Sequence, residues 1–318
     1  MCASRRSSPL LSLTDILLPN AAQGGQAFLV DRHFNMVHVP QLYFPRREGP
    51  VGDGARPHEG TLLDGEVVRT ADGKSVKYLI FDLTNINGAS VVKRPLYRRL
   101  QYAHDDVIRP REMDAQHDYS KEPFTVELKP FFEVWQCDYI LKELVPVQTH
   151  ENDGIILTPV TKPYWPGTFD GLLKWKPSSL NTVDFMVQMR YRQRVPRIML
   201  CVSDRLASID YEWLTLPPEQ EHMANDPDLN NTVVECKFDP DLVTYHPRPE
   251  GNSYSEDFET RKGGWRILKV RDDKPLPNDL RVVGKVKQSI KDNIEEEEFL
   301  KMMLAQKPAG MVRKRARE

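Results

Sequence analysis

The stretch "LLKWKPSSLNTVDF", residues 172–185, places two lysines one residue apart around a tryptophan. If it forms a β-strand, alternate side chains share a face, so Lys174 and Lys176 would lie together and Leu173 and Trp175 would lie opposite. Lysine is rarely buried without a partner. Either both ammonium groups lie in water, or negative charges such as those of a phosphate chain lie between them.

Two carboxylates and an aromatic ring occur earlier, in strand-like sequence. In "LLDGEVV", Asp64 and Glu66 are spaced to share one strand face, where paired carboxylates can hold a metal ion or a ribose. The Asp-Gly pair is also an ordinary turn signal. In "YLIFDL", Phe81 alternates with Ile80 and Asp82, and a single strand phenylalanine is more often a core residue than a stacking platform. Neither fragment decides between function and structure by itself.

A charged cluster follows the last apolar strand, in "WRILKVRDDKPLPND". Here Lys269, Arg271 and Lys274 surround Asp272 and Asp273. One interpretation is a surface salt-bridge cluster, and the other is a cationic lid for a polyphosphate.

The composition describes an ordinary globular chain that must hold anions locally. The chain has 318 residues, 28% charged and 40% hydrophobic, which suits two domains. The formal net charge of −2 provides no global positive field. The four cysteines form no CxxC pair and no zinc-like spacing, which indicates a reducing compartment without a structural metal. No apolar run approaches ~18 residues and Asp15 interrupts the N-terminal one, so we expect neither a membrane span nor a secretory signal.

The C-terminal residues are basic. Residues 307–318 form a tail with the cluster Arg313, Lys314, Arg315 and Arg317. This cluster fits a nuclear import signal or a solvated tail, and the first interpretation predicts a protein of the nucleus.

The apolar pattern predicts the elements that position these side chains. Residues 1–26 carry loop formers without periodicity, and we expect them to be disordered or non-native. Residues 27–185 should form an α+β domain with antiparallel-rich sheets, a hairpin around "ADGK" and a helical region at 93–118. Residues 186–306 alternate in short strands that predict a small antiparallel barrel, followed by one helix through residues 279–304.

Five segments in this order resemble the collinear motifs of covalent nucleotidyltransferases. They are "LLDGEVV", "YLIFDL", "NDGIILTP", "LLKWKPSSLNTVDF" and "WRILKVRDDK". Within that superfamily they are most similar to eukaryotic messenger-RNA capping guanylyltransferases, and the resemblance extends from about Phe28 to Asp279. The resemblance implies a nucleotidyltransferase domain followed by a C-terminal oligonucleotide-binding (OB) barrel that closes over it as a lid.

The resemblance also implies a two-step reaction. A lysine in a K-x-D-G motif attacks the α-phosphate of GTP with a Mg²⁺ or Mn²⁺ ion, and pyrophosphate leaves. The lysine-bound GMP then passes to the 5′-diphosphate end of nascent RNA, which caps the messenger. The implied partners are GTP, 5′-diphosphate RNA and, from the family alone, the phosphorylated C-terminal domain of RNA polymerase II.

Carried over by position, the resemblance assigns roles around the base and the metal. Glu66 would meet the ribose or the metal, Phe81 would stack on guanine, and Lys129 would read the guanine oxygen. Asp153 would support the metal region. Asp184 would organise the metal or the lysines.

The same resemblance assigns the phosphate contacts. Lys174 and Lys176 would grip the α-phosphate and its neighbours. From the barrel, Arg271, Asp273 and Lys274 would reach the β- and γ-phosphates when the lid closes.

The K-x-D-G nucleophile is the motif that this chain does not match. By the family's spacing it would fall near Leu11–Thr14, and no lysine occurs between Met1 and Gln26. The first lysine, Lys74, belongs to the "ADGK" turn. The chain is then a truncated or mispredicted copy, a non-catalytic homologue that binds GTP or RNA, or a chain whose lysine comes from another polypeptide. The first two predict no lysine–GMP adduct on this chain, and the loss of a strand predicts poor packing around residues 1–27.

Two rival functions remain open. An ATP-dependent polynucleotide ligase shares the superfamily motifs and the barrel, and a preference for ATP over GTP would favour it. An adaptor that binds RNA or polymerase through the barrel surface would explain the missing nucleophile. The pairing of "LLKWKP" with "TVDF" favours the capping enzyme over the ligase.

Overall fold

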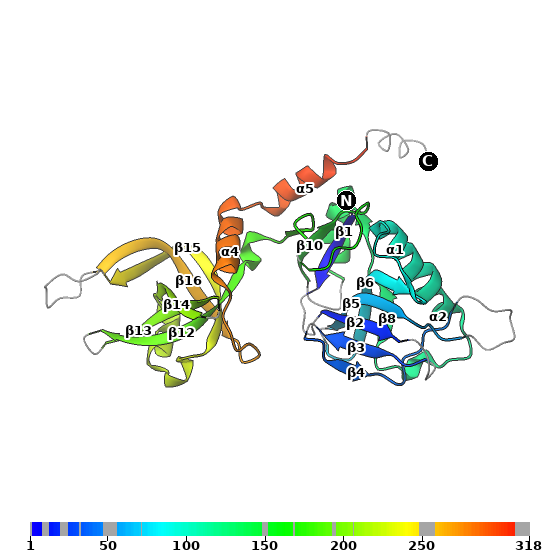
Figure 1. Cartoon of the computed structure of the whole chain (residues 1–318). Coiled ribbons are helices and arrows are strands. Elements are labelled where there is room, and N and C mark those ends of the chain that lie inside the picture. The colour runs from blue at the N-terminus through cyan, green and yellow to red at the C-terminus, as the bar shows by residue number, and fades with distance from the viewer. Residues whose placement is uncertain are drawn as a thin grey trace. The chain divides into compact units, whose positions relative to one another are not determined.

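The structure, a computed structural model, contains helices and three largely antiparallel sheets, which confirms the predicted α+β class (Figure 1). It describes residues 2–7, 13–19, 25–31, 33–46, 56–70, 72–147, 152–167, 169–192, 195–205, 207–247 and 258–308. No helix in these ranges is both long and apolar enough to cross a membrane.

The chain divides into two compact units. The first comprises Met1–Trp175 and Glu297–Glu318, and the second comprises Lys176–Glu296. The division falls at Trp175, whereas the sequence predicted a boundary at residue 185. The reason is that Thr182 already begins a strand of the second unit's sheet.

The larger sheet of the first unit has seven strands. Its order is β4-β3-β2-β5-β6-β7, and β8 pairs with β6 in parallel. The strands are β2 (Leu13–Leu18), β3 (Phe28–Asp31), β4 (Met36–His38), β5 (Thr61–Arg69), β6 (Val76–Ile86), β7 (Ala89–Ser90) and β8 (Thr125–Leu128).

The predicted hairpin joins β5 to β6, and its turn has the expected chemistry. Gly73 adopts a left-handed φ of 69°, and the Thr70 hydroxyl donates to Asp72 at 2.6 Å. Within β5, Gly65 is required by close packing, because a Cβ there would lie 2.4 Å from the Tyr78 ring. The glycine of "LLDGEVV" thus lets the buried tyrosine cross the strand that carries the two carboxylates.

The smaller sheet of the first unit has the order β11-β10-β1-β9. These strands are β1 (Cys2–Ser7), β9 (Phe132–Glu133), β10 (Asn152–Thr158) and β11 (Leu173–Trp175). Trp175 is buried and stacks on Phe299 of helix α5 (Glu296–Leu304) at a centroid distance of 4.2 Å. The C-terminal helix therefore completes the core of this sheet.

The N-terminal strands differ from the sequence prediction, which gave residues 1–26 no regular structure. β1 pairs with both β9 and β10, and β2 pairs with β3 and β5. Ile16 and Leu18 are buried in the core of the seven-stranded sheet. These segments form strands because they pair with strands distant in the sequence, and such pairing cannot be predicted from local periodicity.

The helical region predicted at residues 93–118 is present as three consecutive pieces. Helix α1 (Leu96–Tyr102) continues through π-helical turns (Ala103–Ile108) into α2 (Arg109–Met113). A short helix, α3 (Cys137–Tyr139), follows β9. Helix α1 carries Arg99 on its buried side, between Leu96 and Leu100.

The second unit contains one five-stranded antiparallel sheet of order β14-β13-β12-β15-β16. The strands are β12 (Thr182–Arg192), β13 (Val195–Asp204), β14 (Ala207–Leu214), β15 (Val233–Pro247) and β16 (Phe258–Val270). Phe185 and Trp265 are buried at its core and contact each other edge to face. The sheet is consistent with the predicted OB fold, but no ladder between its described residues closes it into a barrel.

The single terminal helix predicted for residues 279–304 is two helices. Helix α4 (Leu280–Asp292) begins where the Asp279 side chain accepts a hydrogen bond from the Arg281 backbone N–H. It ends at Asn293, which has a left-handed φ of 43°. Helix α5 begins after this break.

Candidate functional site

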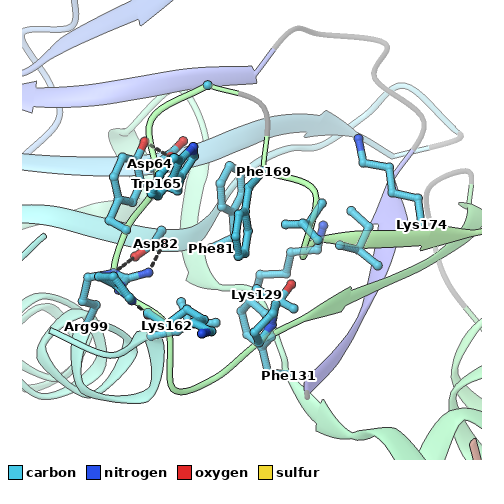
Figure 2. A pocket seen from close by; sticks show the side chains of 18 of the residues that line it. Asp64, Phe81, Asp82, Arg99, Lys129, Phe131, Lys162, Trp165, Phe169 and Lys174 are labelled. Carbon is cyan, nitrogen blue, oxygen red and sulfur yellow. Dashed lines mark hydrogen bonds and ion pairs between the residues drawn. The ribbon is translucent and has the colours of Figure 1, made fainter. Parts of the chain in front are cut away.

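One cavity of about 500 Å³ opens between the two sheets of the first unit. Strands β5 and β6 line one side, and β10 with the loop that follows it lines another. Four of the side chains that the sequence assigned to nucleotide binding meet here: Glu66, Phe81, Lys129 and Lys174. Figure 2 shows Phe81, Lys129 and Lys174 around the cavity.

Glu66 and Lys129 form a buried ion pair at this cavity. The Lys129 Nζ lies 2.5 Å from the Glu66 Oε1, and both residues are less than a tenth exposed. The Lys129 backbone N–H donates to the Ile80 carbonyl, so β6 fixes the base of the lysine. A buried ammonium group of this kind can donate a further hydrogen bond to a carbonyl oxygen of a ligand.

Phe81 and Asp82 both line the cavity although they are neighbours on β6. In the ladder with β5, Asp82 pairs with Asp64 and Ile80 pairs with Gly65, which leaves Phe81 as an extra residue. Such a bulge disrupts the strict alternation of side chains along a strand. It brings an aromatic ring and a carboxylate to the same wall.

Asp82 binds Arg99 of α1 through two hydrogen bonds, of 2.6 and 2.7 Å. Arg99 is 3% exposed and also donates to the backbone carbonyls of Arg94 and Lys162. The arginine thereby joins β6, α1 and the loop after β10. The sequence alone predicts no role for Asp82 or Arg99. One sequence feature could have indicated a buried role for Arg99: it lies three residues after Leu96, on the apolar side of the helix.

A second acidic pair lies on adjacent strands of the same wall. Asp15 of β2 is opposite Asp64 of β5, and Tyr164 donates its hydroxyl proton to Asp64 at 3.0 Å. Burial, and next the charge of Asp15, raise the pKa of Asp64 to about 8. Burial also raises the pKa of Asp15. Two carboxyl groups this close cannot both ionise easily, so one retains its proton at neutral pH.

This pair should make the first unit less stable as pH rises. In the unfolded chain both carboxyls ionise near pH ~4, whereas the folded chain keeps a proton on Asp64 up to about pH 8. The unfolded state therefore binds fewer protons between these values, and stability falls across this window. We expect Asp15→Asn to increase the free energy of unfolding at pH 7.5 by about 1–2 kcal/mol, less than the full pKa shift because burial of Asp64, the larger cause, remains in the variant.

Thermal unfolding of wild type and Asp15→Asn between pH 5 and 8.5 measures this effect. The variant should show a shallower loss of stability with pH. Asp138→Asn, which alters an exposed carboxylate, serves as the control. Equal pH profiles for wild type and Asp15→Asn would contradict the assigned coupling.

The two lysines of the "LLKWKP" stretch are not in the same strand. β11 ends at Trp175, with Lys174 exposed and Trp175 buried. Lys174 lines the cavity, whereas Lys176 follows the strand and donates to the Leu180 carbonyl at 2.9 Å. The predicted strand therefore contains Lys174 but not Lys176. Proline at residue 177 helps to end the strand.

Four further charged residues of the sequence prediction meet in the second unit. Asp184 accepts from Lys274 at 2.6 Å and from Arg271 at 3.2 Å. Arg271 also binds Asp273 through two hydrogen bonds of 2.8 Å and lowers the pKa of Asp273 to about 2. The Asp184 backbone carbonyl accepts from the Asn278 N–H. The sequence placed these side chains in one site, and they do form one ionic cluster. Its phosphate ligand stays a prediction.

The described residues do not form a ready set of ligands for a divalent ion. Among the described residues, no three His, Cys, Asp or Glu side chains group as metal ligands. Glu66 and Asp184, the predicted metal ligands, belong to different units, and each already binds cationic side chains. Mg²⁺ is commonly held by one or two carboxylates with substrate phosphates and waters. Asp153 lies in β10, and its side chain falls outside the described part of the structure.

Comparison with known sequences connects both units to one family. Residues 15–178 match the family described as mRNA capping enzyme, catalytic domain, and residues 180–300 match mRNA capping enzyme, C-terminal domain. The mRNA-capping enzyme subunit alpha of Schizosaccharomyces pombe is 30% identical over 296 residues, covering 87% of this chain and 67% of the relative. The mRNA-capping enzyme of Danio rerio is 38% identical over 162 residues, covering 49% of this chain and 26% of the relative.

Among solved structures, a mycobacterial DNA ligase D complexed with ATP and MES aligns over 86% of this chain and 90% of the ligase chain. Its sequence identity is 15% and its TM-score is 0.39, a likeness too distant to argue from. The sequence matches, in contrast, extend through both units. The chain therefore belongs to the mRNA capping enzyme family of nucleotidyltransferases.

Proposed function

We propose that this chain is an mRNA guanylyltransferase homologue of the nuclear capping reaction, which binds GTP in the cavity of its first unit but forms no lysine–GMP intermediate because the nucleophilic lysine motif is absent. The observation that supports this most is the meeting of an aromatic ring, a buried lysine–glutamate pair and an exposed lysine in one cavity of about 500 Å³. A volume of this order suits a nucleotide-sized ligand. The family match supports nucleotidyl transfer in mRNA capping as the reaction class. In the proposed family reaction, GMP moves from GTP to 5′-diphosphate RNA.

The side chains of the cavity divide the recognition of GTP between them. Phe81 would stack on the base, and Lys129 would donate to the guanine oxygen O6 while it holds Glu66 in place for the ribose or the metal. Lys174 would bind the α-phosphate from β11, and the basic group at Lys176 would add to this charge. Glu66 and Asp184, with Asp153 in support, are the carboxylates that would hold a Mg²⁺ or Mn²⁺ ion together with the triphosphate, and the ion would neutralise charge on the phosphates.

The ionic cluster of the second unit would serve the outer phosphates. Arg271 and Lys274 already bind carboxylates of Asp184 and Asp273. A triphosphate would offer these cations stronger charge-assisted hydrogen bonds, so the carboxylates hold the cations oriented until the nucleotide binds. RNA with a 5′-diphosphate end is the proposed acceptor. The phosphorylated tail of RNA polymerase II is a proposed partner on the strength of the family resemblance.

GTP binding and lysine–GMP adduct formation can be tested separately on this chain. Residues 1–26, where the family's nucleophilic lysine would be expected, contain no lysine. We expect reversible GTP binding, tighter than ATP binding, in calorimetric titrations with Mg²⁺. We also expect no radiolabel on the protein after incubation with α-labelled GTP and denaturing electrophoresis.

Each of the other outcomes would lead to a different conclusion. Tighter binding of ATP would favour a polynucleotide ligase, and binding of neither nucleotide would favour an RNA- or polymerase-binding adaptor. A labelled protein band would mean that a lysine of this chain accepts GMP. In that case, mass spectrometry of the labelled peptide would identify the lysine.

A further inference from the structure

An aromatic pair outside the assigned nucleotide contacts lines the same cavity. Trp165 and Phe169 lie in the loop between β10 and β11, with ring centroids 6.1 Å apart and planes inclined by 30° (Figure 2). They are the one ring–ring pair among the described side chains of this cavity. Trp165 is 60% exposed. Single exposed apolar residues are common, but adjacent rings that line a cavity form a contiguous apolar surface, which is typical of binding grooves.

The fold anchors the backbone next to Trp165 through Tyr164. The Tyr164 backbone N–H donates to the Val92 carbonyl at 2.8 Å, and its hydroxyl donates to Asp64. Arg99 holds the Lys162 carbonyl two residues earlier. The loop is thus anchored to α1 and β5 immediately beside the exposed tryptophan.

Phe169 is positioned by close packing against its own loop. A Cβ on Gly171 would lie 2.5 Å from the Phe169 Cζ atom, so this ring position requires a glycine two residues later. The Leu172 N–H donates to the Phe169 carbonyl at 3.1 Å. The backbone beside Trp165 is therefore anchored, and the Phe169 ring packs closely against Gly171.

The surroundings of the pair indicate what it binds. Lys162 and Lys174 also line the cavity, and both are exposed. Aromatic faces accompanied by lysines are the usual combination for nucleotides, since the ring takes the base and the ammonium group takes the phosphate. An apolar ligand would offer no negative charge to the ammonium groups of Lys162 and Lys174.

We propose that Trp165 and Phe169 form a second stacking platform, separate from Phe81, that takes a nucleobase of the substrate. This inference rests on the proposed function. The base belongs either to GTP or to the first nucleotide of a 5′-diphosphate RNA. Both ligands present a planar base next to phosphates. The experiment below distinguishes GTP from RNA as the source of the base.

The test compares the full-length wild type with the Trp165→Ala/Phe169→Ala double variant. The probes are GTP, a 5′-diphosphate RNA trinucleotide and inorganic tripolyphosphate, which has phosphates but no base. Loss of a stacking platform should weaken binding of a base-bearing probe by about 5- to 100-fold. Tripolyphosphate should bind both proteins equally. A loss with GTP assigns the base to the nucleotide, and a loss with RNA alone assigns it to the acceptor.

Two further variants control for altered folding. Trp165→Phe keeps an aromatic face and should retain most of the affinity. Phe34→Ala removes a ring that is 85% exposed in the β3–β4 turn and does not line the cavity, so it should change nothing. Unchanged affinity of the double variant for both base-bearing probes, or an equal loss for tripolyphosphate, would overturn the platform. Failure of the wild type to bind GTP or RNA would instead overturn the proposed function, and the platform with it.

Discussion

Replacement of Arg99 by methionine is expected to destabilise the first unit by about 3–5 kcal/mol. The guanidinium group is 3% exposed and makes two hydrogen bonds to Asp82 as well as bonds to two backbone carbonyls. Its removal leaves a buried carboxylate without its cation, which costs more than the pair itself contributes. The measurement is urea unfolding at pH 7, followed by circular dichroism.

Two companion variants separate the buried pair from general effects. Arg98→Met changes the neighbouring exposed arginine and should alter stability by less than about 0.5 kcal/mol. Arg99→Met combined with Asp82→Leu removes both charges and should recover a large part of the loss. A double variant as unstable as Arg99→Met alone would show that the backbone contacts of Arg99, rather than its ion pair, carry the effect.

The second large effect is expected at the C-terminal helix. Phe299 is 3% exposed and stacks on Trp175 with planes only 8° apart. Phe299→Ala should cost about 3–5 kcal/mol, since it removes a buried ring and leaves a cavity. Helix α5 has nine residues, too few to be stable alone in water, so it should lose most of its amide protection.

Hydrogen exchange monitored by mass spectrometry resolves this result to the helix. Peptides from residues 296–304 should exchange rapidly in Phe299→Ala, and peptides from β10 and β11 should exchange moderately faster. Met302→Ala truncates a 47% exposed side chain of the same helix and should leave the pattern unchanged. Retained protection of α5 in Phe299→Ala would show that other contacts hold it to the sheet.

Local sequence patterns predicted well the features that depend on neighbouring residues. The β5–β6 hairpin follows from an Asp-Gly turn between alternating apolar runs, and the helical region of residues 93–118 follows from apolar spacing. The order of the motifs indicated the capping enzyme family, which the comparisons confirm. Four of the side chains chosen on that basis meet in one cavity.

The features that the sequence did not predict depend on the tertiary structure and not on local pattern. Residues 1–26 show no periodicity, yet β1 and β2 are strands within the two sheets, because neighbouring strands supply their hydrogen bonds. The break between α4 and α5 depends on one left-handed asparagine in an otherwise helical pattern. The positions of the two predicted metal ligands in different units could not be seen from their spacing.

The sequence by itself therefore determined the α+β class, the hairpin that carries Asp64 and Glu66, and the family. Turn chemistry and side-chain alternation act over a few residues, so a sequence displays them directly. Only the tertiary structure decided which side chains share the cavity. A bulge at Phe81 brings Asp82 to the same wall, the end of β11 separates Lys174 from Lys176, and strand pairing sets Asp15 against Asp64. Each of these depends on register between distant strands, and a change of one residue in register moves a side chain to the other face.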